Sequence, residues 1–272
     1  MATLDIDRWV ARSRALDLAS VPWDEVPCHA LPAEAIRALE YMQDIESHTI
    51  VYLRTLLATR AIDDPEVATF LACWLYEETF HGLALGRFLA AAGAPVAPRA
   101  RSRPSLGRRV NALLTTLVAK TWRDFVAVHM TWGAINELTT LCGYRRLAAV
   151  APHPVLSGLL DRIVLDESRH FLFYFEQARR RLEKPGAARL TRALVDRFWA
   201  PVGSGVQPAA ETRFLAAYLF SGAEGRAAAR KVDATIATLP RFEDTRLLQD
   251  WMDGGRSRES DRRTPYVWET AS

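Results

Sequence analysis

The feature of this sequence that most constrains its fold is a set of long segments whose apolar residues recur at steps of three and four. In residues 32–60 this spacing is carried by Ile36, Leu39, Tyr41, Met42, Ile45, Ile50, Leu53 and Leu56. Side chains three or four positions apart share one face of a helix, so the spacing predicts amphipathic helices. Alternating runs rich in Val, Ile and Thr, which are typical of strands, do not occur. The sequence therefore predicts an all-α protein.

Proline and glycine set the predicted helix ends. Long helices are expected over residues 32–60, 65–92, about 106–150 and 154–182, and shorter ones over 187–199, 208–238 and 242–252, with an interruption at Gly222. We expect one domain over residues 1–272, in which a bundle at about 32–183 carries the site. Accessory helices at 187–252 and a mobile tail at 253–272 follow it.

Composition and charge exclude several classes of function. The chain has 35 basic and 32 acidic residues and a net charge of +3, which does not indicate a nucleic-acid binder. It shows no apolar run of 18 residues and no signal peptide, so we expect no membrane span. Its three cysteines, Cys28, Cys73 and Cys142, are widely separated and lack CxxC spacing, which favours a reducing, cytoplasmic setting.

Two short motifs carry the chemistry. Residues 77–81 read Glu-Glu-Thr-Phe-His and residues 166–170 read Asp-Glu-Ser-Arg-His, so each has a Glu three positions before a His. Side chains three positions apart lie on one face of a helix. Glu78 with His81, and Glu167 with His170, can therefore each bind one metal ion as a pair. Apolar neighbours on both helices indicate that these pairs face the core.

Two further acids stand where the helical periodicity favours apolar residues. Glu46 lies in the first long helix and Glu137 in the third. Burying a lone carboxylate costs roughly several kcal/mol, so two such positions beside two Glu-x-x-His motifs indicate a cation. Four helices that supply Glu, Glu-x-x-His, Glu and Glu-x-x-His have the ligand set of di-iron and di-manganese bundles. Oxygen and nitrogen donors without thiolate favour iron or manganese over structural zinc. The alternative is a buried carboxylate network without metal.

The same motifs resemble those of a known family. YEETFHG at residues 76–82 is similar to the EENRHG motif of the acyl-carrier-protein desaturases, and DESRHFLFY at 166–174 is similar to their second motif. NELTT at 136–140 resembles their QELAT-type segment. The resemblance covers residues of about 20–185, and the last 85 or so residues diverge. It implies a ferritin-like four-helix bundle with additional N- and C-terminal helices.

The resemblance also implies roles for individual residues. Glu46 and Glu137 would be terminal ligands of two iron ions, for which manganese could substitute; Glu78 and Glu167 would bridge them, and His81 and His170 would each bind one. Thr140 matches the family threonine that manages protons where oxygen binds, although its hydroxyl could equally bond back to a helix carbonyl. We expect Asp166 to pair with His81 and Glu77 with His170, unless these acids are solvated.

The implied activity is O2-dependent desaturation of an acyl chain on acyl carrier protein, with electrons from a donor such as reduced ferredoxin, in a homodimer. Five arginines, Arg99, Arg101, Arg103, Arg108 and Arg109, are candidates for docking the acidic carrier, and Arg179–Arg181 are a second candidate. Three alternatives stay open: a related di-iron hydroxylase or N-oxygenase, a ferritin-like iron-handling protein without organic substrate, and a bundle that has lost its chemistry.

Overall fold

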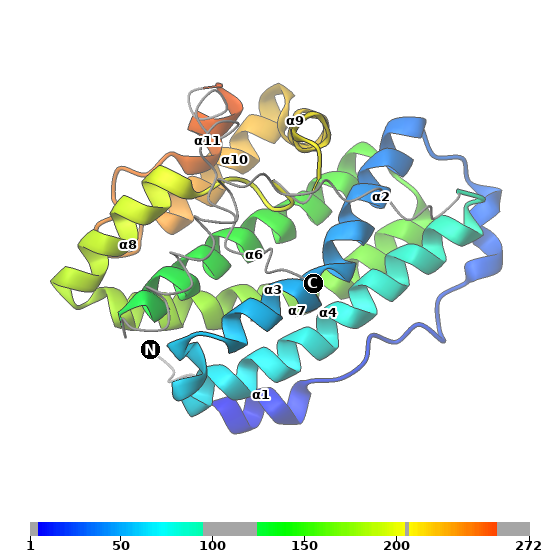
Figure 1. Ribbon diagram of the computed structural model, residues 1–272. Helices are drawn as coiled ribbons and strands as arrows, with labels where there is room; N and C mark the ends of the chain where they lie inside the picture. The colour runs from blue at the N-terminus through cyan, green and yellow to red at the C-terminus, as the bar shows by residue number, and fades with distance from the viewer. Residues whose placement is uncertain (1–4, 95–123, 205–206, 255–272) are drawn as a thin grey trace.

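The helices account for nearly all of the regular structure of the chain (Figure 1). A computed structural model describes residues 5–94, 124–204 and 207–254. Within these ranges there is no β-strand, so the prediction of an all-α helical bundle is confirmed. None of the helices in the described ranges combines the length and the apolar character needed to cross a membrane.

Four long helical paths make up the bundle. They are α2 (Ala33–Ser47) continued by α3 (Thr49–Leu57), α4 (Pro65–Ala91), α6 (Phe125–Val150) and α7 (Pro154–Leu182). α2 packs on α4, and α6 packs on α7 over its length (Figure 1). Capping residues set two of the starts, because the Asp64 carboxylate accepts hydrogen bonds at the first turn of α4 and the His153 ring does so at α7.

The first long helix is interrupted, which corrects the prediction of one helix over residues 32–60. His48 lies between α2 and α3. Its ring Nδ1 lies 2.6 Å from the Asp44 carbonyl oxygen, the acceptor that a continuous helix would give to the His48 backbone N–H. That N–H donates to Ile45 instead, at 2.9 Å. The break therefore falls two residues after Glu46.

The chain beyond residue 184 adds α8 (Pro185–Phe198), α9 (Ala209–Phe220), α10 (Gly222–Ile236) and α11 (Leu247–Met252). The predicted interruption at Gly222 is confirmed, since this glycine has a φ of +70° at the junction of α9 and α10. α9 and α10 both contact α6, and α9 also contacts α2 (Figure 1).

The last helix begins later than predicted. Helix α11 covers only the end of the expected 242–252 segment. The buried Asp233 carboxylate on α10 accepts hydrogen bonds from the backbone N–H groups of Leu248 and Gln249, both at 3.0 Å. This long-range cap stabilises a start at Leu247, and a sequence window cannot reveal it because the capping residue lies 15 positions away.

Three short elements precede α4. Helix α1 (Ile6–Arg12) packs on α4, where its buried Trp9 ring contacts the rings of Phe70 and Phe173. The 3₁₀ helices η1 (Trp23–Cys28) and η2 (Arg60–Asp63) lie beside α4 as well. The predicted start of the third long helix near residue 106 and nearly all of the predicted tail lie outside the described residues.

One close approach between α6 and α7 lies next to the candidate site. A Cβ atom added at Gly133 would lie 2.3 Å from Cδ1 and 2.8 Å from Cγ of the buried Tyr174 ring. Gly133 is one turn before Glu137, and Tyr174 is one turn after His170. The absence of a side chain at position 133 therefore sets the distance between two helices that carry candidate ligands.

Gly133→Ala should destabilise the protein by about 1–3 kcal/mol, because the buried ring must move to make room for the methyl group. Gly158→Ala on α7 is the matched control, since no heavy atom lies within 4 Å of a Cβ at that position. The control should be neutral or stabilising by about 0.5–1 kcal/mol. Urea unfolding of both variants tests this, and equal midpoints would contradict it.

Candidate metal centre

The six side chains that the sequence predicted as ligands meet in the core of the bundle. Each of the four long helical paths contributes at least one of them, and all six are buried: Glu46 on α2, Glu78 and His81 on α4, Glu137 on α6, and Glu167 and His170 on α7. Four carboxylates and two imidazoles thus lie together where the rest of the core is apolar.

Their ligand atoms form two overlapping groups. One group contains Glu46, Glu78, His81 and Glu167, and the other contains Glu78, Glu137, Glu167 and His170. In each group one nitrogen or oxygen atom per residue lies within 4.8 Å of those of the others. Each group can hold a metal ion, and Glu78 and Glu167 are common to both. Two such groups with two carboxylates in common fit the ligand set of a dinuclear centre.

The shared carboxylates lie between the two imidazoles. Glu167 Oε1 is 3.2 Å from Nδ1 of His81, while its Oε2 is 3.8 Å from Nδ1 of His170. Glu78 Oε1 is 3.0 Å from the same atom of His170 and 3.9 Å from that of His81. Each shared carboxylate is therefore within reach of both halves of the site.

The inward-facing atoms lack hydrogen bonds. Nδ1 of His81, Nδ1 of His170, Oε1 of Glu78 and both carboxylate oxygens of Glu167 are buried, and none has a hydrogen-bond partner in the part of the chain that the structure describes. An unsatisfied buried polar atom costs roughly 1–3 kcal/mol. Five such atoms facing one space fit a site for cations, which these donors can coordinate.

The outward-facing nitrogens of the two histidines are paired with acids. Nε2 of His81 is 3.4 Å from Oδ2 of Asp166, and Nε2 of His170 is 2.7 Å from Oε2 of Glu77. These are the two pairings that the spacing of the motifs predicted. When the ring is neutral, a carboxylate at Nε2 favours the tautomer that carries the proton there, which leaves the Nδ1 lone pair available to a metal ion.

The charges of the site are mutually dependent. Burial, together with the negative charge of Glu78, raises the pKa of Glu46 well above its usual range. Burial acts to lower the pKa of His81, but the neighbouring carboxylates of Asp166 and Glu167 outweigh it and raise that pKa to about 10. The pKa of His170 is also raised, because the surrounding carboxylates outweigh its burial. Protons therefore occupy positions that a cation would take.

Sequence reasoning missed three residues around the site. The Tyr144 hydroxyl donates to Oε1 of Glu46. The Arg169 guanidinium contacts the carboxylate of Glu77. The Trp9 ring lies 6.3 Å from the His170 ring. Arg169 belongs to a recognised motif, but no periodicity links any of these residues to its partner.

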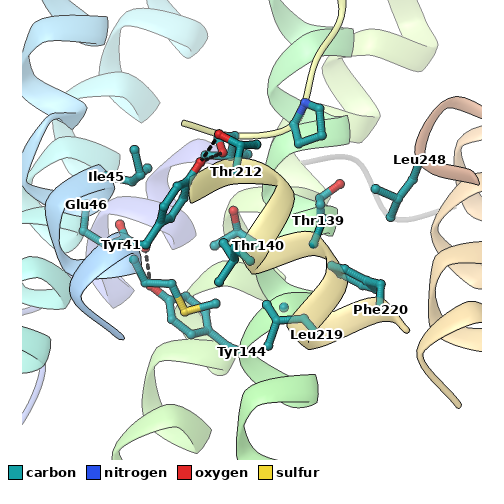
Figure 2. A pocket seen from close by; sticks show the side chains of 16 residues that line it. Tyr41, Ile45, Glu46, Thr139, Thr140, Tyr144, Thr212, Leu219, Phe220 and Leu248 are labelled. Atoms are coloured by element: carbon teal, nitrogen blue, oxygen red, sulfur yellow. Dashed lines mark hydrogen bonds between the residues drawn. The ribbon is translucent and has the colours of Figure 1, made fainter. Parts of the chain in front are cut away.

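A largely apolar pocket lies beside Glu46 (Figure 2). It contains about 580 Å³ of empty space, including its open mouth, and lies between α2, α6, α9, α11 and residues 201–202. Thr139 and Thr140 both line it. The Thr139 hydroxyl bonds back to the Ile135 carbonyl at 2.7 Å, whereas the Thr140 hydroxyl makes no hydrogen bond within the described residues. Thr140 is thus the threonine whose hydroxyl is available to the pocket.

The structure bears differently on the two groups of arginines that the sequence offers for docking. Arg99 and the other four arginines of residues 99–109 lie outside the described residues. Arg179–Arg181 are all paired with acids: Arg179 with Glu176 and Glu183, Arg180 with Glu66, and Arg181 with Asp64. This second surface is charge-balanced, which disfavours it as a site for an acidic carrier.

Scans against protein-family models, curated protein sequences and solved structures found no match for this chain. The resemblance to the desaturases consequently depends on the three short motifs and on the geometry of the residues within them.

Metal loading should release protons, because the raised pKa values of His81 and His170 keep both imidazoles protonated at pH 7. We expect at least two protons per chain on addition of Co²⁺. The apparent affinity should rise as the pH rises toward the His81 pKa of about 10, by about tenfold per unit for each displaced proton. A pH-stat titration measures both quantities. His81→Gln should release one proton fewer, and an affinity that falls with rising pH would contradict the prediction.

Proposed function

We propose that this protein is a di-iron, O2-dependent oxidoreductase that desaturates an acyl chain carried on acyl carrier protein. The observation that carries the proposal is the pair of overlapping ligand groups that share Glu78 and Glu167. Their donors are carboxylate oxygens and imidazole nitrogens without thiolate, a set that suits iron or manganese. The resemblance of the motifs to those of the desaturases favours iron.

Different residues of the chain would have different roles at this site. Bound iron would supply the reduction of dioxygen and the removal of hydrogen from an unactivated carbon. Asp166 and Glu77 hold the histidines in one orientation. Thr140, whose hydroxyl is available to the pocket, is placed to donate or accept a proton there. The buried ligands exclude bulk water from the centre.

The pocket supports an extended apolar substrate. Most of its lining is aliphatic or aromatic and comes from three helices and the 201–202 segment: Tyr41, Met42, Ile45, Pro201, Val202, Leu215, Ala216, Leu219, Phe220 and Leu248. Polar groups come from Glu46, Thr140 and Tyr144, among others (Figure 2). A hydrocarbon chain buried there would have its reacting carbon near the ligand Glu46.

Partners belong to the same proposal. Desaturation with O2 needs two electrons from outside the substrate, so a ferredoxin-like donor is expected. The carrier's acidic surface would dock at the arginines of residues 99–109, and a homodimer is expected from the resemblance. A hydroxylase or N-oxygenase would use the same ligands and pocket and differ only in the product.

Two measurements test the proposal. Anaerobic reconstitution should give two irons per chain, and Glu78→Ala should abolish binding of the pair because this carboxylate belongs to both groups. Glu66→Ala, an acid at the start of the same helix, is the matched control and should keep both irons. The reconstituted protein, supplied with reductant and O2, should remove two hydrogens from an acyl carrier, as read by intact mass.

The outcomes separate the candidate functions. A gain of one oxygen would indicate hydroxylation. Two irons without change in any of a broad panel of acyl carriers would favour the iron-handling alternative. Fewer than two irons in the wild type, or unchanged iron in Glu78→Ala, would overturn the dinuclear centre itself.

Gly143→Leu should shorten the acyl chain that the enzyme prefers. A Cβ at Gly143 would meet only Met42 Cε at 3.5 Å and Leu219 Cδ1 at 3.6 Å, so Gly143→Ala fits and serves as the control. A leucine side chain would fill part of the pocket, and each excluded methylene should cost about 10–200-fold in kcat/KM. We would compare kcat/KM across carriers of different chain length, at matched iron content. An unchanged length preference would exclude this pocket as the acyl site.

A further inference from the structure

We propose that Arg169 positions both metal-binding histidines through a single guanidinium group. This inference rests on the proposed metal centre and assigns the residue that holds its ligands in place. Arg169 contacts no candidate ligand atom in the geometry described above, so it is a positioning residue rather than a catalytic one.

The contacts form a continuous chain between the two histidines. NH1 of Arg169 is 3.1 Å from Oδ1 of Asp166, and NH2 is 2.5 Å from Oε1 of Glu77. Each acid uses its other oxygen for a histidine: Asp166 for His81 and Glu77 for His170. The guanidinium therefore occupies the outer oxygen of both carboxylates and keeps the inner oxygens on the imidazoles.

The repeat of the two motifs shows why one arginine serves both sides. In 166–170 the residue before the histidine is Arg169, but in 77–81 the equivalent residue is Phe80. Phe80 packs on Tyr76, with ring centroids 5.2 Å apart, and provides no cation. Arg169 thus has no counterpart in the α4 motif, and the acids of both motifs share it.

The surroundings strengthen these ion pairs. The Glu77 side chain is completely buried and that of Asp166 is 13% exposed, while that of Arg169 is 27% exposed. The Trp9 ring lies 5.3 Å from the guanidinium carbon and covers it. Solvent and salt screen such a group less than a surface pair. Moreover, a planar guanidinium presents several N–H donors in fixed directions, so it can bind two carboxylates at once, whereas an ammonium is a point charge.

The charge count shows the consequence of losing Arg169. The four ligand carboxylates balance two divalent cations, whereas Asp166 and Glu77 add two negative charges that Arg169 offsets in part. Without the guanidinium, the buried Glu77 loses the cation at its outer oxygen, and both acids lose the contact that fixes them against the imidazoles. Both metal positions should then weaken, although each histidine lies in a different ligand group.

Arg169→Ala tests the proposal with Co²⁺ as the probe. Loss of partners that orient ligands typically costs about 10–100-fold in metal affinity, so both Co²⁺ dissociation constants should rise by about this factor. In the Co²⁺ wild type, NMR should show two hyperfine-shifted, slowly exchanging Nε2–H signals, one from each histidine. Both should exchange rapidly in the variant.

Arg180→Ala is the matched control, because Arg180 also joins α7 to α4, through Glu66 at 3.3 Å. It should leave both affinities and both signals unchanged. Arg169→Lys keeps the charge but replaces the two terminal nitrogens, each of which contacts one acid, by a single nitrogen on a shorter side chain, so it should restore one Nε2–H signal at most. If Arg169→Ala fails to fold, Arg169→Lys alone tests the proposal. Recovery of both Nε2–H signals in Arg169→Lys would overturn the shared role of the guanidinium.

Other results also overturn the inference. Unchanged Co²⁺ affinities in Arg169→Ala, or loss confined to one position, would show that one guanidinium does not serve both histidines. A wild type that binds fewer than two Co²⁺ ions would instead overturn the proposed metal centre, so the two failures are distinguishable.

Discussion

The burial of four carboxylates in the middle of the helices is the constraint on which the rest of the structure depends. In an apolar core such groups are strongly unfavourable unless protons, hydrogen bonds or cations neutralise them. Around Glu46 the structure provides a hydrogen bond from the Tyr144 hydroxyl, and burial raises the pKa of the carboxyl group. Arg169 forms an ion pair with the buried Glu77 beside the centre. The inward oxygens of Glu167 face Nδ1 of both histidines instead, at 3.2 and 3.8 Å, where a metal ion could replace the imidazole protons.

The pocket and the buried centre meet at one residue. Glu46 belongs to a ligand group and also lines the pocket, just before α2 breaks at His48. Helix α9 forms much of the opposite wall. The four long helical paths thus supply the candidate ligands, whereas the helices after residue 184 shape the space beside them.

Features that depend on nearby residues were predictable. The all-α fold, the ends of α4 and the interruption at Gly222 follow from periodicity, capping and glycine, which act within a few positions. The break at His48 was not predicted because the His48 ring competes with the His48 backbone N–H for the Asp44 carbonyl oxygen. The spacing of apolar residues contains no information on this competition. The start of α11 was not predicted because Asp233 caps it from another helix.

By itself the sequence determined which residues could be ligands and on which helices they lie. A Glu-x-x-His motif places its two side chains on one helical face whatever the fold, and an acid in an apolar stripe must face the core. The pairings of Asp166 and Glu77 followed from the repeat of the motifs. Only the tertiary structure decided that Tyr144 holds Glu46, that Arg169 joins both acids and that a pocket lies beside Glu46. The contacts of Tyr144 with Glu46 and of Arg169 with Glu77 join residues more than 90 positions apart, and several helices form the pocket, whereas local spacing does not determine how helices pack.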